Sequence, residues 1–247
     1  MKIPFYLLIL SFFHFTCTDD NSGLTGKGTL EIVFKAVYDS KPLYVGNAYD
    51  YFGSGTIKFS KGDFFISDLR LKNIEDNVQV KDVDYISLIE HQVNEATALE
   101  GLVVKYTNIK SGDYSELNFD FGLSSDLNKK KPAEFAPTHP LGEGTHYWAG
   151  WNSYIYSKSE GVFSTGSSNF NFSYHSGFDA AKRFIQFSKL IKIRDSEITK
   201  ILIEIDYKKL FDEGGLGMDI AANPQIHNTS SIMNAFVDRF QSSIQIK

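Results

Sequence analysis

Hydrophobic and polar residues alternate along three long stretches of this chain, at residues 30–36, 116–123 and 201–207. Alternation with a period of two puts apolar side chains on one face of an extended strand and polar side chains on the other. Each stretch therefore predicts a strand with one buried face. Other short apolar runs are flanked by residues typical of turns. These runs predict strands at Thr56–Phe59, Phe64–Leu71, Tyr85–Glu90, Leu102–Tyr106, Ser153–Ser157, Phe170–Tyr174 and Phe184–Lys189.

Helical periodicity is scarce by comparison. It is clearest at Ser231–Ser242, where Ile232, Phe236 and Phe240 recur every four residues. A short turn at Tyr207–Phe211 is a second candidate. No Pro-, Gly- or Ser-rich boundary interrupts the chain after its first residues, so we expect one all-β domain at residues 28–247. Its predicted fold is an antiparallel β-sandwich or flattened barrel with a short C-terminal helix.

Composition and charge narrow the class of protein further. Hydrophobic residues make up 42% of the 247, which is enough for a buried core. The net charge of -5 argues against nucleic-acid binding, and basic residues do not form a stripe interleaved with aromatics. The sequence also lacks a phosphate-binding glycine loop, His-Glu-x-x-His and Gly-x-Ser-x-Gly. We therefore expect a protein that is not an enzyme and does not bind nucleic acid.

The N-terminus has the features of an export signal. Lys2 is followed by an apolar stretch from Ile3 to Phe15, and the only cysteine of the chain, Cys17, follows it. This order predicts a lipoprotein signal peptide at residues 1–16, and a lipidated Cys17 with a flexible tether at residues 17–27. The alternative is an ordinary signal peptide with an incidental cysteine. With lipidation, we expect an outer-membrane lipoprotein of the cell envelope, periplasmic or surface-exposed, held by its anchor only.

Both tryptophans lie in one short aromatic segment, with Trp148 and Trp151 three residues apart. If residues 146–148 are extended, His146 and Trp148 face the same side and Tyr147 the opposite one. An imidazole beside an indole can form a core edge, a stacking platform or half of a metal site. The sequence leaves these alternatives open.

Histidines are the remaining candidates for chemistry. His175 ends a predicted strand on its polar face, in register with Asn171 and Ser173. Strand ends and loops can bring histidines together at one rim of a sandwich, and imidazole ligands suit copper or zinc. The alternative is that each is an ordinary surface or core residue. The other histidines that follow the predicted signal peptide are His91, His139, His146 and His227.

Several motifs follow one another in a specific order along the chain. They are Tyr49-Asp-Tyr-Phe-Gly, Phe64-Phe-Ile-Ser-Asp-Leu-Arg-Leu71, Asp84-Tyr-Ile-Ser-Leu-Ile89, Gly112-Asp-Tyr-Ser-Glu-Leu-Asn-Phe-Asp-Phe-Gly122, His146-Tyr-Trp-Ala-Gly-Trp and Phe172-Ser-Tyr-His-Ser-Gly177. This order resembles the MbnP-like family of copper-binding periplasmic proteins. The resemblance extends from about Gly28 to Ile246, and its sharpest part is Tyr-Trp-x-x-Trp followed by Glu160-Gly161.

This resemblance implies a secreted protein, often encoded beside a dihaem peroxidase of the MauG type. In the best-known relatives that partner oxidises a tryptophan to kynurenine, which helps to hold copper. The sequence departs from the family pattern at two places. His146 stands where methionine is common, and Phe34-Lys35-Ala36 lacks a histidine that many relatives carry after the phenylalanine.

Two functions follow from the sequence and the resemblance together. The first is a lipid-anchored copper-binding protein with His146 and His175 as ligands, close to each other at one rim of the sheet. Trp148, Trp151, Tyr147 and Glu160 would line this site, with a tryptophan oxidised. The second is a non-enzymatic surface module that binds glycan or protein through exposed aromatics.

Overall fold

The computed structural model describes residues 26–51, 53, 55–212, 217–227 and 231–247. The predicted signal peptide at residues 1–16, Cys17 and most of the tether at residues 17–27 lie outside the described residues. No described helix is both long and apolar enough to cross a membrane.

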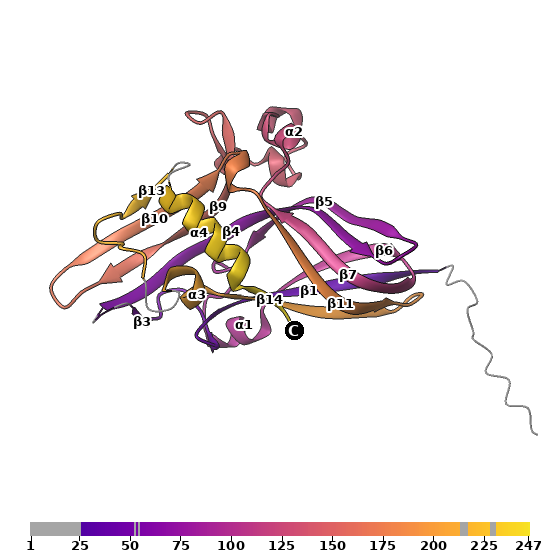
Figure 1. Ribbon diagram of the computed structural model, residues 1–247, viewed down its shortest axis with the longest axis horizontal. Coiled ribbons are helices and arrows are strands. Elements are labelled where there is room, and N and C mark those ends of the chain that lie inside the picture. The colour runs from indigo at the N-terminus through magenta and orange to yellow at the C-terminus, as the bar shows by residue number, and fades with distance from the viewer. Residues whose placement is uncertain (1–25, 52, 54, 213–216, 228–230) are drawn as a thin grey trace, which may run out of the picture.

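Two packed sheets form the framework of the protein (Figure 1). The smaller has the order β14-β12-β1-β2, with β6 also paired to β1. The larger has the order β11-β7-β4-β9-β10-β13, with β3 and β5 paired to β4 and β8 paired to β9. The strands are β1 (Lys27–Tyr38), β2 (Lys41–Pro42), β3 (Tyr49–Tyr51), β4 (Gly55–Lys72), β5 (Asn77–Ser87), β6 (Leu102–Lys110), β7 (Gly112–Phe121), β8 (Tyr147–Trp148), β9 (Ser153–Ser164), β10 (Asn169–Gly177), β11 (Arg183–Ile193), β12 (Ile198–Asp206), β13 (Gln225–Ile226) and β14 (Ile244–Ile246).

Four α-helices are described, and α4 is the longest of them. The α-helices are α1 (Glu95–Glu100), α2 (Ser125–Asn128), α3 (Tyr207–Phe211) and α4 (Ser231–Ser243). Single 3-10 turns are η1 (Pro132–Glu134), η2 (Pro140–Gly142), η3 (Gly144–His146) and η4 (Asp179–Ala181). The predicted sandwich with a short C-terminal helix is confirmed, and α3 and α4 match the two helices expected from the sequence.

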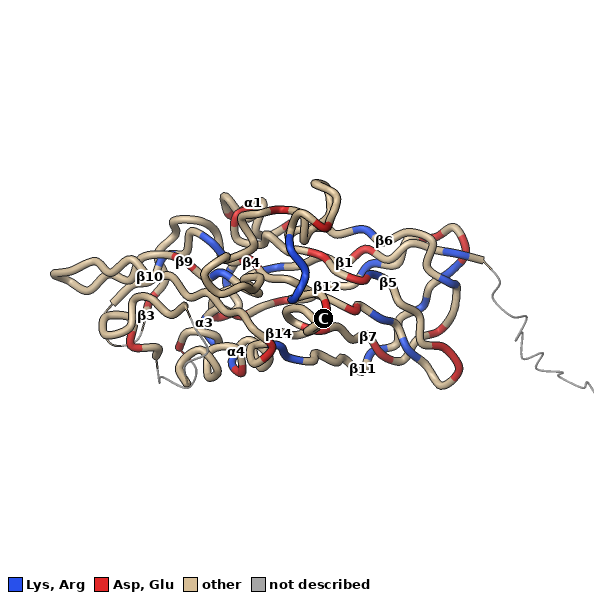
Figure 2. Tube along the Cα trace, turned by 90° about the horizontal axis from the view of Figure 1, so that it is seen from above, with Lys and Arg blue, Asp and Glu red and all other residues tan. Residues whose placement is uncertain are grey.

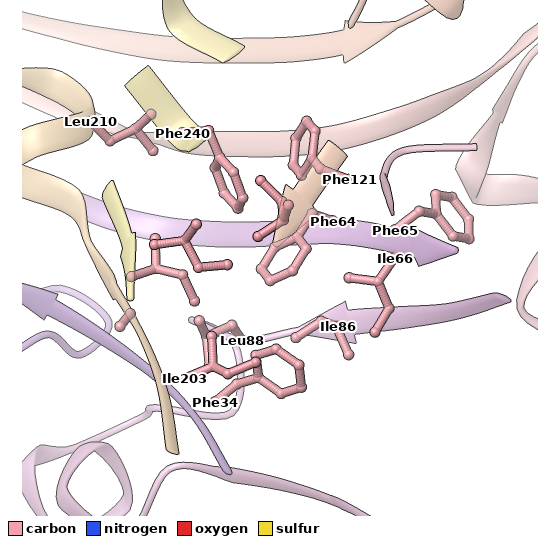
Figure 3. Packing of buried hydrophobic residues seen from close by; sticks show 14 of the residues in the cluster. Phe34, Phe64, Phe65, Ile66, Ile86, Leu88, Phe121, Ile203, Leu210 and Phe240 are labelled. Atoms are coloured by element: carbon pink, nitrogen blue, oxygen red, sulfur yellow. The ribbon is translucent and has the colours of Figure 1, made fainter. Parts of the chain in front are cut away.

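The core lies between the two sheets and beneath α4. Phe34 on β1 meets Phe64 on β4, with ring centroids 6.2 Å apart. Phe240 of α4 lies 5.1 Å from Phe64 and 4.2 Å from Phe121 of β7. Figure 3 shows Phe64, Phe121 and Phe240 gathered together, whereas Phe65 points away from them. These rings are almost completely buried, so α4 is held by the same core as the sheets.

Three details differ from the sequence predictions. The two strands expected at 56–59 and 64–71 are one long strand, β4, which shifts register between Phe59 and Lys61 and again between Ser67 and Arg70. The strand expected at Tyr85–Glu90 ends at Ser87. The N–H groups of Leu88 and Ile89 both donate hydrogen bonds to the carbonyl of Gly62, which interrupts the regular pairing with β4. The β1–β12 and β10–β13 pairs are parallel, so the sheets are mixed.

Charged side chains are distributed over the surface of the strands. Figure 2 shows basic and acidic positions intermixed along β1, β6 and β5. Glu31 of β1, for example, lies within ion-pair distance of Lys105 on β6 and Lys200 on β12. Charges of both signs therefore lie side by side on these strands.

Candidate functional site

The hairpin of β9 and β10 sets the position of the first two polar side chains. Glu160 on β9 is opposite Ser173 on β10, and Lys158 is opposite His175. Residues opposite each other in an antiparallel pair share a face, and so do residues two apart on one strand. All four side chains therefore project from the same face of the larger sheet, the one away from Phe64.

His175 is held by hydrogen bonds on one side of its ring only. Its Nε2 lies 2.8 Å from Glu160 Oε1 and 3.1 Å from Ser173 Oγ. An ionised carboxylate only accepts hydrogen bonds, so the neutral ring carries its proton on Nε2 and donates it to Glu160. The other nitrogen, Nδ1, is buried and has no hydrogen-bond partner among the described residues. With the proton on Nε2, the lone pair of Nδ1 has no partner among the described residues.

Burial favours the neutral form of His175. It lowers the pKa of the imidazole, and the neighbouring His227 lowers it further, while the hydrogen bond to Glu160 opposes the shift. The neutral form is the one that can bind a metal ion.

A second imidazole, that of His227, lies directly beside His175. β13 runs parallel to β10, with Gln225 opposite Ser173 and Ile226 opposite Tyr174, which places His227 at the level of His175. The two rings stack, with centroids 4.7 Å apart and an angle of 11° between their planes. Nε2 of His227 lies 2.9 Å from Ser173 Oγ, so one hydroxyl connects both imidazoles. His227 was not among the site residues predicted from the sequence.

The two tryptophans lie against this imidazole pair. Their rings stack with centroids 4.8 Å apart, because β8 and β9 form a tight hairpin. Trp148 meets His227 edge-on at 5.3 Å and His175 at 6.4 Å. Trp148 remains 36% exposed, so one face of the cluster opens to solvent.

Trp151 lies deeper in the cluster and packs over the end of β10. A Cβ atom added at Gly177 would lie 3.0 Å from its Cζ3 atom, so the backbone approaches the indole closely there. Phe178, whose ring is 5.2 Å from Trp151, adopts a φ of 65° and a ψ of 162°. A non-glycine residue rarely adopts this conformation, and it costs about 1–3 kcal/mol. The bend that carries Phe178 against Trp151 is therefore strained.

His146 occupies a different part of the same face. Its ring stacks on Tyr85 of β5 with centroids 3.7 Å apart and meets Phe65 of β4 edge-on at 5.5 Å. The prediction of an extended strand at 146–148 is wrong for His146, which ends a 3-10 turn, and the strand begins at Tyr147. The Glu143 carboxylate accepts a hydrogen bond from the N–H of Thr145 and starts the 3-10 turn Gly144–His146. Consequently His146 and Trp148 contact different groups.

The structure thus brings together four of the six predicted site residues and adds two others. Trp148, Trp151, His175 and Glu160 gather with Ser173 and His227, and no contact within the described part of the chain joins His146 to His175. Tyr147 turns to the opposite side, as expected from strand alternation. Its hydroxyl lies 3.0 Å from Asn152 Oδ1, and its ring meets Tyr154 edge-on.

Comparison with known proteins identifies the family of this chain and relatives of its fold. A family model described as MbnP matches residues 27–233 of the chain. The chain belongs to the MbnP family. Among solved structures, MbnP from Methylosinus trichosporium is similar in fold, with a TM-score of 0.53, 12% sequence identity and coverage of 89% of this chain and 98% of that one. No curated protein sequence matches.

Copper, the metal that the resemblance to MbnP-like proteins implies, can be tested against the donor atoms of the cluster. No three His, Cys, Asp or Glu side chains in the described ranges are arranged as a ready metal cage. Two features nevertheless fit a copper ion. Imidazoles are common copper ligands, and His175 has an unpaired buried Nδ1 while its Nε2 is fixed by a carboxylate. In a typical metal-binding histidine, one ring nitrogen binds the metal and the other donates a hydrogen bond to a carboxylate, which orients the ring.

Proposed function

We propose that this MbnP-family protein is a lipid-anchored copper-binding protein of the cell envelope, with its copper site at the imidazole pair of His175 and His227. The observation that carries the proposal is the pair itself. Two stacked imidazoles lie beside the tryptophans, and one of them has a free, buried nitrogen oriented by Glu160. We infer a binding role because two adjacent imidazoles are typical copper ligands.

Each residue has a distinct role in this proposal. His175 would bind copper through Nδ1, and His227 would supply the second imidazole. Ser173 and Glu160 would position the two rings through the hydrogen bonds already described. His146 stays a predicted ligand from the sequence analysis, although its contacts with Tyr85 and Phe65 place it over strands β5 and β4.

Trp148 is the proposed position of the oxidised tryptophan. It is the more exposed of the two indoles, and its ring is the one that contacts both imidazoles. Opening an indole leaves an aryl amine and a ketone, so a hydrophobic residue would gain polar atoms next to the histidines. A dihaem peroxidase of the MauG type is the proposed partner for this oxidation, and exposed Trp148 would be the point of contact.

Copper affinity of a small variant series tests the site. Purified protein without its signal peptide should bind one copper ion, and His175→Ala or His227→Ala should each reduce affinity by about tenfold or more, equivalent to about 1.4 kcal/mol. His139→Ala is the matched control, because His139 lies in another loop and stacks on Phe135. Unchanged affinity in both site variants would refute the assignment, and a loss with His146→Ala would extend the site to that residue.

Peptide mass spectrometry of protein isolated from its native host tests the tryptophan proposal. We expect a modified mass for the peptide that contains Trp148, and an unmodified mass for the same peptide made in a host without the peroxidase. If both samples have the unmodified mass, Trp148 is not oxidised.

One observation favours the second candidate function, a surface module that binds glycan or protein. The stacked pair of Trp148 and Trp151 forms a partly exposed aromatic platform, of the kind that contributes strongly to interfaces. Under this candidate, Trp148→Ala would abolish binding of a glycan or protein while copper content stays at zero in every sample.

A further inference from the structure

Lys158 lies on the strand between the candidate copper site and a buried carboxylate. On β9 it is opposite His175 of β10 on one side and opposite Asp63 of β4 on the other. These three side chains share one face of the sheet. Directly opposed residues in antiparallel strands have Cβ atoms about 5 Å apart, so the lysine side chain begins next to that of His175.

The ammonium group of Lys158 is half-buried beneath the turn that carries His146. Its Nζ atom donates a hydrogen bond to the backbone carbonyl of Thr145 at 2.9 Å. No carboxylate in the described part of the chain lies within ion-pair distance of this atom. The nearby carboxylates have other partners, since Lys61 lies 3.4 Å from Asp63 and 2.8 Å from Glu90.

The side chain of Lys158 is partly desolvated, and charged groups of both signs surround it. Burial lowers its pKa, and the charge of Lys61 lowers it further, while Asp63 and Glu160 oppose the shift. The positive charge of Lys158 in turn contributes to the lowered pKa values of His146 and His175, after the larger effect of burial. The field of this ammonium thus reaches His175, one of the two imidazoles that the proposed copper site would use.

A fixed positive charge beside a metal site acts on the metal in proportion to the charge of the ion. Cu(II) is repelled twice as strongly as Cu(I) at the same position. We propose that Lys158, placed opposite His175 and without a direct carboxylate partner, is a specificity-determining residue that shifts the site's preference from Cu(II) toward Cu(I). The inference rests on the proposed copper site at His175 and His227.

A purely structural role for Lys158 makes a different prediction. If the lysine only holds the turn at Thr145, its loss would alter the site geometry and change the affinities for both ions by similar factors. An electrostatic role instead changes the logarithm of the Cu(II) affinity about twice as much as that of Cu(I). The ratio of the two affinities therefore separates the roles.

Three variants of the mature chain provide the test. Lys158→Met removes the charge and keeps the length of the side chain, whereas Lys158→Arg keeps the charge. Lys192→Met is the control, because Lys192 is an exposed residue of β11. Cu(I) and Cu(II) dissociation constants are measured by competition with chelators of known affinity, Cu(I) anaerobically. The midpoint potential of the bound copper is measured on the same samples.

For Lys158→Met, we expect the affinity ratio of Cu(II) to Cu(I) to rise about tenfold. This corresponds to a midpoint potential about 59 mV lower for a one-electron couple. Lys158→Arg and Lys192→Met should retain the wild-type ratio. A wild-type ratio in Lys158→Met, with copper still bound, would overturn this assignment alone. Absence of copper binding by the wild-type protein would overturn the proposed function and this assignment with it.

Discussion

Replacing His146 with phenylalanine should change how the stability of the protein depends on pH. The imidazole stacks on Tyr85 and meets Phe65 edge-on, and a phenyl ring can retain both contacts. Burial lowers the pKa of His146 from 6.5 to about 4, with a further contribution from the charge of Lys158. The native protein therefore keeps this ring neutral under mildly acidic conditions.

The sign of the effect follows from proton binding. As the pH falls from 6.5 toward 4, the unfolded chain takes up a proton at His146 and the native state does not, so acidification favours unfolding. The two pKa values differ by about 2.5, and one pKa unit corresponds to about 1.36 kcal/mol, which sets an upper limit of about 3 kcal/mol. Solvent screens a partly exposed ring, so we expect about 1–2 kcal/mol.

Urea unfolding at about pH 7.5 and about pH 4.5 measures this difference. His146→Phe should be more stable relative to wild type at the lower pH by about 1–2 kcal/mol than at the higher pH. Asp63→Asn is the control of opposite sign. Burial raises the pKa of Asp63 to about 6, so the wild-type carboxyl adds stability as the pH falls below that value. Equal effects of His146→Phe at both pH values would refute the argument.

Three further predictions concern the core and the anchor. Phe240→Ala should lower the free energy of unfolding by about 3–5 kcal/mol in urea titrations, because the ring fills the space between Phe64 and Phe121; a cost below about 1 kcal/mol would contradict the packing described. Gln92→Leu should cost about 2–3 kcal/mol in the same assay, since the fully buried side-chain amide accepts a hydrogen bond from the N–H of Ala36 on β1, and that N–H would be left unsatisfied. Cys17→Ser should move the protein from the membrane fraction to the soluble one, and retention in the membrane fraction would exclude a lipid anchor at this position.

Strand alternation was enough to predict most of the framework. The apolar residues at 30–36 lie on β1 and those at 201–205 on β12, as the period of two predicts, whereas Tyr207 at the end of the second run begins α3. The parallel pairing of these two strands was not predictable, because the alternation of a buried strand is the same whichever way its neighbour runs. The boundary at Ser87 was missed for a related reason. Leu88 and Ile89 are fully buried, although they lie in a turn and not in the strand.

The candidate site was predicted in part, for equally local reasons. Placing His175 and Ser173 on one polar face required only the register of a single strand. His227 depends on β13, a strand of two residues that pairs with β10 across about 50 intervening residues in sequence, which local patterns do not encode. The run Gln225-Ile-His227 alternates polar and apolar residues, as a short strand does, but nothing in the sequence shows that this strand pairs with β10.

Pulsed electron paramagnetic resonance of the copper(II)-loaded protein tests the copper site most directly, because nitrogen modulation counts the imidazoles bound to the metal. The account predicts two coupled imidazoles in the wild-type protein, and one in His175→Ala and in His227→Ala. A spectrum without coupled imidazole, or one that is identical in wild type and both variants, would contradict a copper site at His175 and His227.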